Sequence, residues 1–327
     1  MQKIRIGIVG YGNISKGVEQ AVIAAPDMEL RAIFTRRDPD LIKPFSTATR
    51  VINSGEAEKY RDEIDVMLLC GGSAKDLPSQ GPHFAAMFNV VDSFDTHAKI
   101  PEYLAEMNSA AKNTIAVISS GWDPGLFSLI RLLSESVLPD GDSYTFWGRG
   151  VSQGHSDAIR RVKGVRNAIQ YTVPLESAVS AVRSGAHPEL TPREKHMREC
   201  FVVTETNASK DSITNEIVSM PNYFSDYDTI VNFIDDDEMK TNHSKMPHGG
   251  FVMHSGRTGK ASNNEHLIEF SLKLDSNPEF TGSIMTAYAR AAFRLAQEGV
   301  SGAKTVFDIP LAYLSVKDRE ALIRELL

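Results

Sequence analysis

The sequence predicts an α/β fold in which a parallel-sheet domain is followed by an α+β domain. Short apolar runs alternate with segments of helical periodicity through about the first 120 residues, which is the rhythm of repeated β-α-β units. Longer stretches that favour β-strands follow Trp122. We therefore expect two domains, residues 1–122 and 123–299, with the segment from about 300 to 327 packing back onto the first.

Local patterns predict the individual elements. Continuously apolar runs are typical of strands buried in a parallel sheet, and Pro26 ends the helix between the first two of them. In the first domain we expect strands at 3–9, 29–34, 64–69 and 116–119, with a helix at 14–24. In the second we expect an antiparallel sheet from 143–147, 168–173, 200–204, 229–234 and 266–274, and a helix at 278–298 that ends before Gly299.

The amino-acid composition limits the classes of partner that the chain is expected to bind. The 327 residues are 42% hydrophobic and carry 35 Lys and Arg against 42 Asp and Glu, so no basic surface indicates nucleic acid or an anionic membrane. No signal-peptide pattern and no apolar run of about 20 residues is present, which favours a cytoplasmic enzyme with a small-molecule partner. Cys70 and Cys200 lack the spacing of disulfide or zinc sites and are expected as buried thiols. The acidic run 235–238 is expected as a solvated loop rather than a metal site.

A glycine motif follows the first strand and opens the first helix. Gly10 permits the tight turn, and Gly12 lets backbone N–H groups approach a pyrophosphate at the positive end of the helix. This context indicates a Rossmann-like dinucleotide-binding domain, although an ordinary strand-to-helix turn has the same pattern. Ser15 stands where a third glycine or alanine is usual, and we expect it to loosen the packing of helix on strand slightly.

The end of the second strand indicates the form of the dinucleotide. Enzymes that use NAD usually place a carboxylate there to bind the ribose hydroxyls. This chain has Thr35, Arg36 and Arg37 instead, and two guanidinium groups match the oxygens of a 2′-phosphate. We therefore expect NADP. A solvated basic turn is the alternative, because Asp38 could pair with either arginine or bind a ribose itself.

Three further loops follow predicted strands and should meet at one edge of the sheet. The loop 70–74 has the small residues that a nicotinamide needs for close approach, although a simple turn would look the same. The loops 92–97 and 121–125 contribute Asp95 and Asp123. Two carboxylates beside a nicotinamide suit a substrate that presents an ammonium group. Helix capping or turn formation is the alternative role for each.

Nearly the whole chain resembles the meso-diaminopimelate dehydrogenase family. The matching stretches are 8–13, 34–37, 120–125, 145–148, 152–157, 246–250 and 273–278. The resemblance implies a homodimeric oxidoreductase with NADP-binding, dimerisation and substrate regions. It also implies reversible oxidative deamination of the D-centre of meso-2,6-diaminopimelate to L-2-amino-6-oxopimelate and ammonia, in lysine and diaminopimelate metabolism, without a metal.

The resemblance also assigns roles position by position. Asp95 and Asp123 would lie near the reacting amino group, either as proton acceptor or as anchors. The substrate residues would be Trp122 and Trp147 at that end, Gln153, Gly154 and Asp157 along the pocket, and Thr172, Arg198, His248 and Asn277 at the distal L-centre. Arg193 is the alternative to Arg198. The cofactor residues would be Gly10, Tyr11, Gly12, Asn13, Ile14, Thr35, Arg36, Arg37, Cys70, Gly71, Gly72, Ser73, Ser93, Phe94 and Asp95. The loop 255–264 is longer than the family pattern, which leaves its behaviour as a lid open.

Two other functions compete with this interpretation. Sugar and inositol dehydrogenases of similar architecture typically carry Glu-Lys-Pro where this chain reads Asp95-Thr96-His97-Ala98. The missing lysine counts against them. A non-catalytic NADP sensor would bind the cofactor but form no NADPH with any amino acid.

Overall fold

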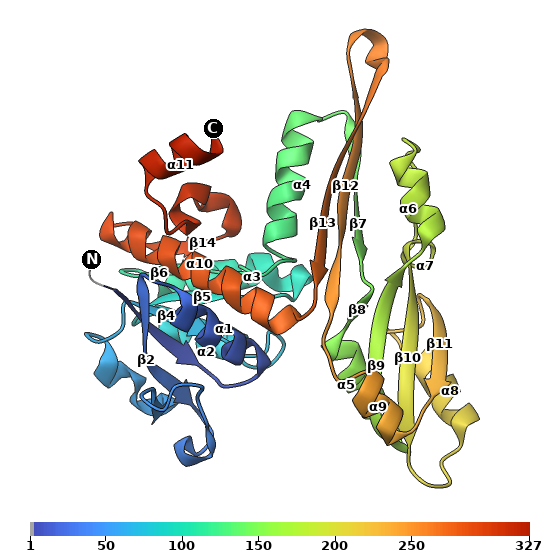
Figure 1. Cartoon of the computed structure of the whole chain (residues 1–327), viewed down its shortest axis with the longest axis horizontal. Helices are drawn as coiled ribbons and strands as arrows, with labels where there is room; N and C mark the ends of the chain where they lie inside the picture. The colour runs from blue at the N-terminus through green and yellow to red at the C-terminus, as the bar shows by residue number, and fades with distance from the viewer. Residues whose placement is uncertain (1–2) are drawn as a thin grey trace. The chain divides into compact units, whose positions relative to one another are not determined.

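The computed structural model describes residues 3–327 and separates the chain into two compact units (Figure 1). Unit 1 comprises the chain up to Leu129 together with Pro278–Leu327, and unit 2 is Ile130–Asn277. These bounds differ from the expected 1–122 and 123–299, because the long helix α10 (Asn277–Gln297) contributes its apolar side chains to the core of unit 1. The segment after residue 300 also lies in unit 1.

Unit 1 is built on a seven-stranded sheet in which every pair of neighbouring strands is parallel. The strand order is β14-β6-β5-β4-β1-β2-β3, so the direction of winding reverses between β1 and β4. In doubly wound sheets a ligand binds at the carboxyl ends of the strands beside such a reversal. The strands are β1 (Ile4–Val9), β2 (Met28–Thr35), β3 (Arg50–Asn53), β4 (Val66–Leu69), β5 (Asn89–Asp92), β6 (Ile115–Val117) and β14 (Gly302–Lys304).

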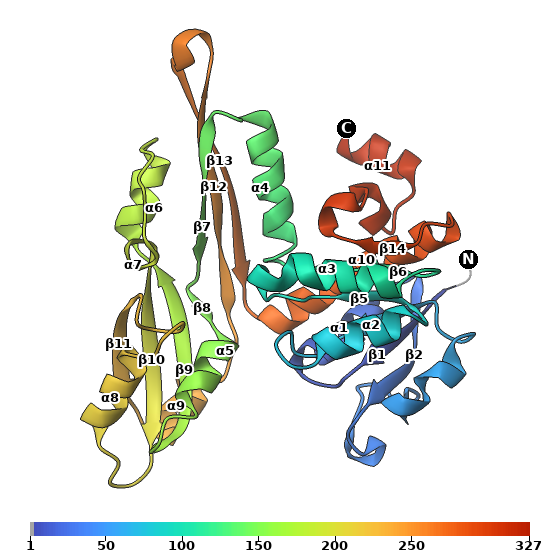
Figure 2. The same ribbon diagram turned by 180° about the vertical axis from the view of Figure 1, so that it is seen from behind.

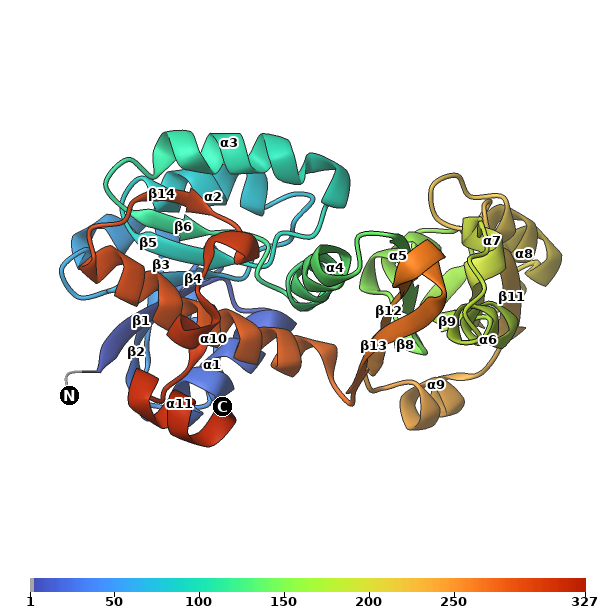
Figure 3. The same ribbon diagram turned by 90° about the horizontal axis from the view of Figure 1, so that it is seen from above.

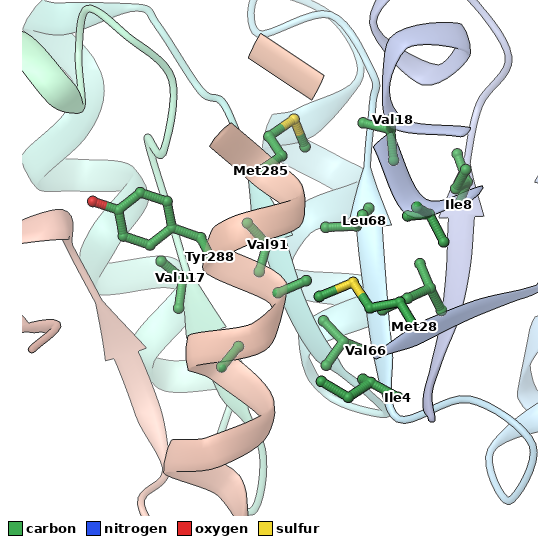
Figure 4. Close-up of a cluster of buried hydrophobic side chains, with 14 of the residues drawn as sticks. Ile4, Ile8, Val18, Met28, Val66, Leu68, Val91, Val117, Met285 and Tyr288 are labelled. Atoms are coloured by element: carbon green, nitrogen blue, oxygen red, sulfur yellow. The ribbon is translucent and has the colours of Figure 1, made fainter. Parts of the chain in front are cut away.

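Helices cover both faces of this sheet (Figure 3). The helices α1 (Asn13–Ala24) and α10 pack on one face, and α2 (Leu77–Ala85) and α3 (Ile100–Ala110) on the other. Figure 4 shows the first core, where Leu68 of β4 lies between Val18 of α1 and Met285 of α10. A Cβ at Gly17 would come within 2.6 Å of the Pro278 carbonyl oxygen, so a glycine here allows α1 and α10 to approach closely. The last helix of unit 1 is α11 (Arg319–Leu326).

Unit 2 contains two smaller sheets. The four-stranded sheet has the order β11-β10-β9-β8 and the three-stranded sheet the order β13-β12-β7. The expected antiparallel pairing is wrong at one place: β10 and β11 are parallel, because α8 (Lys210–Val218) connects them as a crossover, as the views in Figures 1 and 2 show. The strands are β7 (Gly141–Trp147), β8 (Gly150–Val151), β9 (Val165–Pro174), β10 (His196–Thr204), β11 (Asp228–Phe233), β12 (His248–Thr258) and β13 (Asn264–Leu274).

Three other expectations about unit 2 change. The run 235–238 is not a loop but the start of α9 (Asp236–Asn242), where the Asp235 side chain accepts a hydrogen bond from Glu238 N at 2.8 Å. The expected loop 255–264 is largely the end of a β12–β13 hairpin, with a 3₁₀ turn at Lys260–Ser262. In unit 2, strands β8 and β12 were not expected, and in unit 1 strands β3, β5 and β14 were not. The remaining helices are α4 (Leu126–Val137), α5 (Gln153–Ile159), α6 (Glu176–Arg183) and α7 (Pro192–Lys195).

Candidate active site

A cavity of about 310 Å³ lies at the carboxyl edge of the unit 1 sheet. Three segments expected to bind the cofactor line it: Gly10–Gly12 after β1, Thr35–Arg37 after β2 and Cys70–Gly71 after β4. Gly10 has a φ of +88°, which a residue with a side chain rarely adopts. Ser54, Asp76 and Gln80 also line the cavity, and nothing in the local sequence pattern singled them out. The cavity therefore offers a glycine loop and a pair of arginines to one ligand.

Ser15 is hydrogen-bonded within the glycine loop, a contact that the sequence did not predict, and the expected looser packing of helix on strand stays a prediction. Its side chain is buried, and its Oγ accepts a hydrogen bond from Gly12 N at 2.6 Å. A close contact between helices occurs two residues further on, at Gly17 against α10. The serine thus holds the turn at the start of α1 in the form that presents backbone N–H groups to a phosphate.

The two arginines after β2 flank the cavity from different directions. Arg36 donates to Asp76 Oδ1 at 2.5 Å and is 65% exposed, while Arg37 donates to the carbonyl oxygen of Tyr11. Asp38 accepts from the backbone N–H of Asp40 and takes part in none of these contacts. A hydrogen bond from Gly72 N and the neighbouring Arg36 lower the pKa of Asp76, so an ionised carboxylate orients Arg36.

A buried carboxylate fixes the tyrosine of the glycine loop. Tyr11 Oη donates to Glu19 Oε2 at 2.6 Å, and Glu19 Oε1 accepts from Phe45 N at 2.8 Å. Glu19 is fully buried in α1. Burial, together with this hydrogen bond, raises the pKa of Tyr11. Sequence analysis missed Glu19, and the available signal was a charged residue on the apolar face of an amphipathic helix.

The loops after β4, β5 and β6 meet at the same edge of unit 1. Asp95 N donates to Ser73 Oγ at 3.1 Å, so the loop after β5 is hydrogen-bonded to the loop after β4. The Asp95 side chain is exposed, Asp123 is half-buried and Trp122 is 8% exposed. Both carboxylates that the sequence selected thus lie on loops at the carboxyl edge of the sheet, the edge that also carries the cavity.

The two cysteines differ slightly from expectation. Cys200 is buried, but Cys70 is only partly buried. Loss of hydration raises the pKa of both thiols to about 12. Both are therefore neutral at physiological pH and have no nucleophilic role.

In unit 2, three residues lie in register across neighbouring strands: Gly150 of β8, Thr172 of β9 and Arg198 of β10. Arg198 donates to Thr172 Oγ1 and stacks with its guanidinium carbon 3.8 Å from the centre of the Tyr227 ring. Arg198 is 6% exposed, and burial lowers its pKa. Of the ion pairs formed within residues 3–327, none includes Arg198. A buried cation without a carboxylate partner is a suitable site for an anionic ligand group.

Arg193, the alternative to Arg198, has a different environment. It is exposed and forms an ion pair with Asp228 at 2.9 Å. The buried position in register with Thr172 is therefore that of Arg198, which favours it as the ligand-binding arginine.

His248 approaches the same line of residues. A Cβ on Gly150 would lie 2.5 Å from the His248 ring, so the absent side chain makes room for the imidazole. His248 Nδ1 lies 2.8 Å from Gly249 N and 3.2 Å from the Gly249 carbonyl oxygen, so the imidazole is held against this backbone segment. Thr172, Arg198 and His248 thus form one polar group, called here the distal cluster.

The other expected substrate residues surround the segment before His248 or lie on α5. Asn277 N donates to the Met246 carbonyl oxygen at 3.0 Å, and Gln153 Nε2 lies 3.4 Å from Met246 Sδ. Gly154 is exposed, and Asp157 is exposed and paired with Arg160.

Trp147 rests on a buried histidine that the sequence did not reveal. Trp147 N donates to His196 Nε2 at 2.8 Å, and the two rings stack with centres 5.4 Å apart. Burial lowers the pKa of His196 to about 3, so it remains a neutral acceptor. A lone histidine at the start of a strand carries no sequence signal for this role.

Two features of residues 3–327 bear on other classes of site. No group of three or more His, Cys, Asp or Glu side chains is arranged to hold a metal ion. In the same range, no helix has both the length and the apolarity to cross a membrane.

The parallel sheet, the glycine loop at its reversal point and the second unit with a buried polar cluster define a two-domain dinucleotide-dependent oxidoreductase. The model of the diaminopimelic acid dehydrogenase C-terminal domain matches residues 121–276. The meso-diaminopimelate D-dehydrogenase of Ureibacillus thermosphaericus is 60% identical, covering 100% of each chain, and that of Corynebacterium glutamicum is 44% identical, covering 99% of each. The chain belongs to the meso-diaminopimelate dehydrogenase family.

Solved structures agree with this assignment. The C. glutamicum DAP dehydrogenase in complex with DAP is 43% identical, with a TM-score of 0.92 and 100% of both chains covered. An engineered D-amino acid dehydrogenase bound to NADP⁺ is 42% identical, with a TM-score of 0.87 and 100% of both chains covered. The expected α/β fold class is therefore confirmed.

Proposed function

We propose that this chain catalyses the NADP-dependent, reversible oxidative deamination of the D-centre of meso-2,6-diaminopimelate, giving L-2-amino-6-oxopimelate and ammonia. Family membership supports the reaction. The observation that carries the choice of substrate is the buried Arg198, which bonds to Thr172 and has no carboxylate partner. A substrate with a second carboxylate at its far end supplies the missing anion, whereas a simple D-amino acid does not.

The cavity fits NADP. The backbone N–H groups at the start of α1 would bind the pyrophosphate, and Arg36 and Arg37 would hold the 2′-phosphate on two sides. When bound, NADP supplies a nicotinamide ring that accepts hydride. The cavity lining also includes the ionised Asp76. Its charge is paired with Arg36, which it orients, so it does not face the phosphate as an unpaired anion.

The two carboxylates of unit 1 account for the proton transfers. The D-centre ammonium must lose a proton before its nitrogen lone pair can form the C=N bond as hydride leaves the carbon. Asp95 or Asp123 accepts that proton or anchors the ammonium while ordered water accepts it. Water then adds to the iminium carbon, and ammonia leaves. We assign the acceptance of the proton and the anchoring of the ammonium to Asp95 and Asp123 as a pair.

The other site residues are proposed from the same grounds. Trp122 and Trp147 would shape the reacting end, and Gln153, Gly154, Asp157 and Asn277 would border the chain of the substrate. Gly154 and Asp157 are exposed, so burial supports their assignment less strongly than it supports the assignment of the distal cluster.

We also propose a cytoplasmic homodimer. Helix α4 exposes Leu132, Leu133 and Val137, which are 45%, 60% and 56% exposed, and apolar side chains grouped in this way commonly lie in interfaces. The mass in solution should be that of two chains, and Leu133→Glu should shift it toward one. A wild-type chain that is monomeric at micromolar concentration would contradict the dimer.

Absorbance at the NADPH band tests the reaction itself. The chain with NADP and meso-diaminopimelate should form NADPH, and NADPH with L-2-amino-6-oxopimelate and ammonia should be consumed. Binding of NADPH without turnover of any amino acid would instead identify a sensor.

A further inference from the structure

Asp92 is the last residue of β5 and is fully buried. Its Oδ1 accepts from Phe94 N at 2.9 Å and from Ser119 N at 3.0 Å, and its Oδ2 accepts from Tyr103 Oη at 2.7 Å. Its backbone carbonyl oxygen accepts from Ser120 N at 2.9 Å and from Ser120 Oγ at 2.8 Å. Five hydrogen bonds therefore converge on one residue that no assigned role includes.

These bonds join two loops. Phe94 lies in the loop that carries Asp95, whereas Ser119 and Ser120 begin the loop that carries Trp122 and Asp123. A single carboxylate oxygen accepts from both loops at once. An apolar side chain of the same size cannot do this, so Asp92 does more than fill space between the strands.

The backbone beyond the carboxylate is strained on one side and packed on the other. Ser119 has a φ of +55°, in the left-handed region that residues other than glycine rarely occupy. Its N–H is one of the two that Asp92 Oδ1 holds. On the other side, the Phe94 ring stacks on Tyr103 with centres 4.2 Å apart. The turn that leads to Asp123 is thus kept in an unfavourable conformation by its surroundings.

Burial makes the charged form of the Asp92 carboxylate energetically unfavourable. Burial raises the pKa of Asp92 to about 6 even though three donors favour the charged form. A buried carboxylate is stabilised only when its donors remain in place. Displacement of either loop would therefore leave a buried oxygen without a partner.

We propose that Asp92 is a positioning residue for the reaction: it fixes the two loops that carry Asp95 and Asp123 relative to each other without touching the substrate. The proposal rests on the proposed function for its catalytic consequence. Its structural consequence, the joint ordering of the two loops, can be measured without any substrate.

Asp92→Ala removes the acceptor, and Asp92→Asn restores it, since the amide oxygen accepts from Phe94 N and Ser119 N while its NH₂ donates to Tyr103 Oη. Asp27→Ala is the matched control: Asp27 is the partner of the buried Arg290 at 2.5 Å, so its loss also destabilises unit 1. It lies just before β2, at the opposite edge of the sheet.

We expect Asp92→Ala to lower kcat about 30-fold to 100-fold, as misplaced reacting groups do, and to raise the deuterium isotope effect on kcat with substrate deuterated at the D-centre. The Kd of NADPH should rise by a smaller factor than kcat falls, because Arg36 and Arg37 are untouched whereas Ser93 and Phe94 of the loosened loop are also expected to contact the cofactor. Asp92→Asn should recover most of kcat. Asp27→Ala should lower Tm with kcat and the isotope effect unchanged.

Amide hydrogen exchange on the free enzyme distinguishes a failure of this proposal from a failure of the proposed function. Asp92→Ala should speed exchange in both 93–97 and 119–125, and Asp27→Ala in neither. If the wild type lacks activity but this pattern holds, the reaction is wrong and the joint ordering stands. Unchanged exchange in either loop, or wild-type kcat in a folded Asp92→Ala, overturns the proposal.

Tyr103→Phe replaces Asp92→Ala if the alanine variant does not fold. It keeps the ring on Phe94 and deletes only the donor to Oδ2. The proposal then requires faster exchange in 93–97 and 119–125 and a raised isotope effect. Wild-type values for both would overturn it.

Discussion

Replacing the distal cluster should convert the enzyme from diaminopimelate toward simple D-amino acids. The perturbation is Thr172→Val, Arg198→Met and His248→Asn together, all in unit 2. The distal carboxylate then loses the buried guanidinium and the hydroxyl beside it. Two charge-assisted hydrogen bonds contribute about 1.5–3 kcal/mol each, so about 3–6 kcal/mol of transition-state binding is lost. At about 1.4 kcal/mol for each factor of ten, kcat/KM for meso-diaminopimelate should fall by about 10² to 10⁴.

The same substitution should not destabilise the chain. Arg198 is a buried cation whose pKa is lowered by burial and which has no ion pair within the described residues 3–327. Removing it relieves a desolvation cost, so Tm should hold or rise. Activity on a D-amino acid with an apolar side chain, such as D-norleucine, should rise relative to meso-diaminopimelate because the buried guanidinium and hydroxyl donors that would otherwise be left unpaired are gone.

The assay is the ratio of kcat/KM for meso-diaminopimelate to that for D-norleucine, in the wild type and the triple variant. Arg193→Met is the control, since Arg193 is an exposed arginine nearby, and it should leave the ratio within about twofold, as surface ion pairs contribute little. The Kd of NADP should not change in either variant. An unchanged ratio in the triple variant would refute the assignment of the cluster.

The remaining predictions concern the cofactor site and pH. Replacing both Arg36 and Arg37 by Ala should lower the preference for NADP over NAD by several tens-fold, because two guanidinium contacts to the 2′-phosphate are lost. The ratio of kcat/KM for the two cofactors measures this preference. If the preference is retained, the 2′-phosphate is bound elsewhere. His196 has a pKa of about 3 in the fold against about 6.5 unfolded, so its contribution to stability is present above pH 6.5 and is lost as pH falls toward 3. His196→Asn keeps an acceptor for Trp147 N and should reduce the loss of Tm between pH 6.5 and 4, whereas an identical pH profile would show that His196 does not titrate as described.

Several helices and strands could be predicted from the sequence, because the spacing of apolar residues and the positions of turn residues are local features of the chain. The expected strands and helices of unit 1 lie within about two residues of β1, α1, β2 and β4. The glycine loop and the two arginines were found because their spacing is fixed by the strand and helix they join. Strand β5 escaped notice because four residues, one of them the polar Asp92, give no clear period.

What the sequence could not supply depends on tertiary partners. The third residue of the glycine motif was interpreted as a packing position, but the Ser15 side chain accepts a hydrogen bond from Gly12 N, a contact that appears only when the turn is folded. Likewise, neither the pairing of Thr172 with Arg198 nor the space that Gly150 leaves for His248 can be read before the strand register is known. Glu19 accepts from Tyr11 Oη and Phe45 N, and His196 accepts from Trp147 N, and no local sequence pattern predicts these pairs.

The most direct test of the account is the comparison of meso- and LL-diaminopimelate as substrates with NADP. In the proposed function, the carboxylates of unit 1 bind the ammonium of the D-centre and Arg198 of unit 2 binds the L-centre. Only the isomer with a D-centre should therefore present its C–H bond for hydride transfer. We predict steady NADPH formation with the meso isomer and none above background with the LL isomer. Comparable turnover of the two isomers would contradict the account.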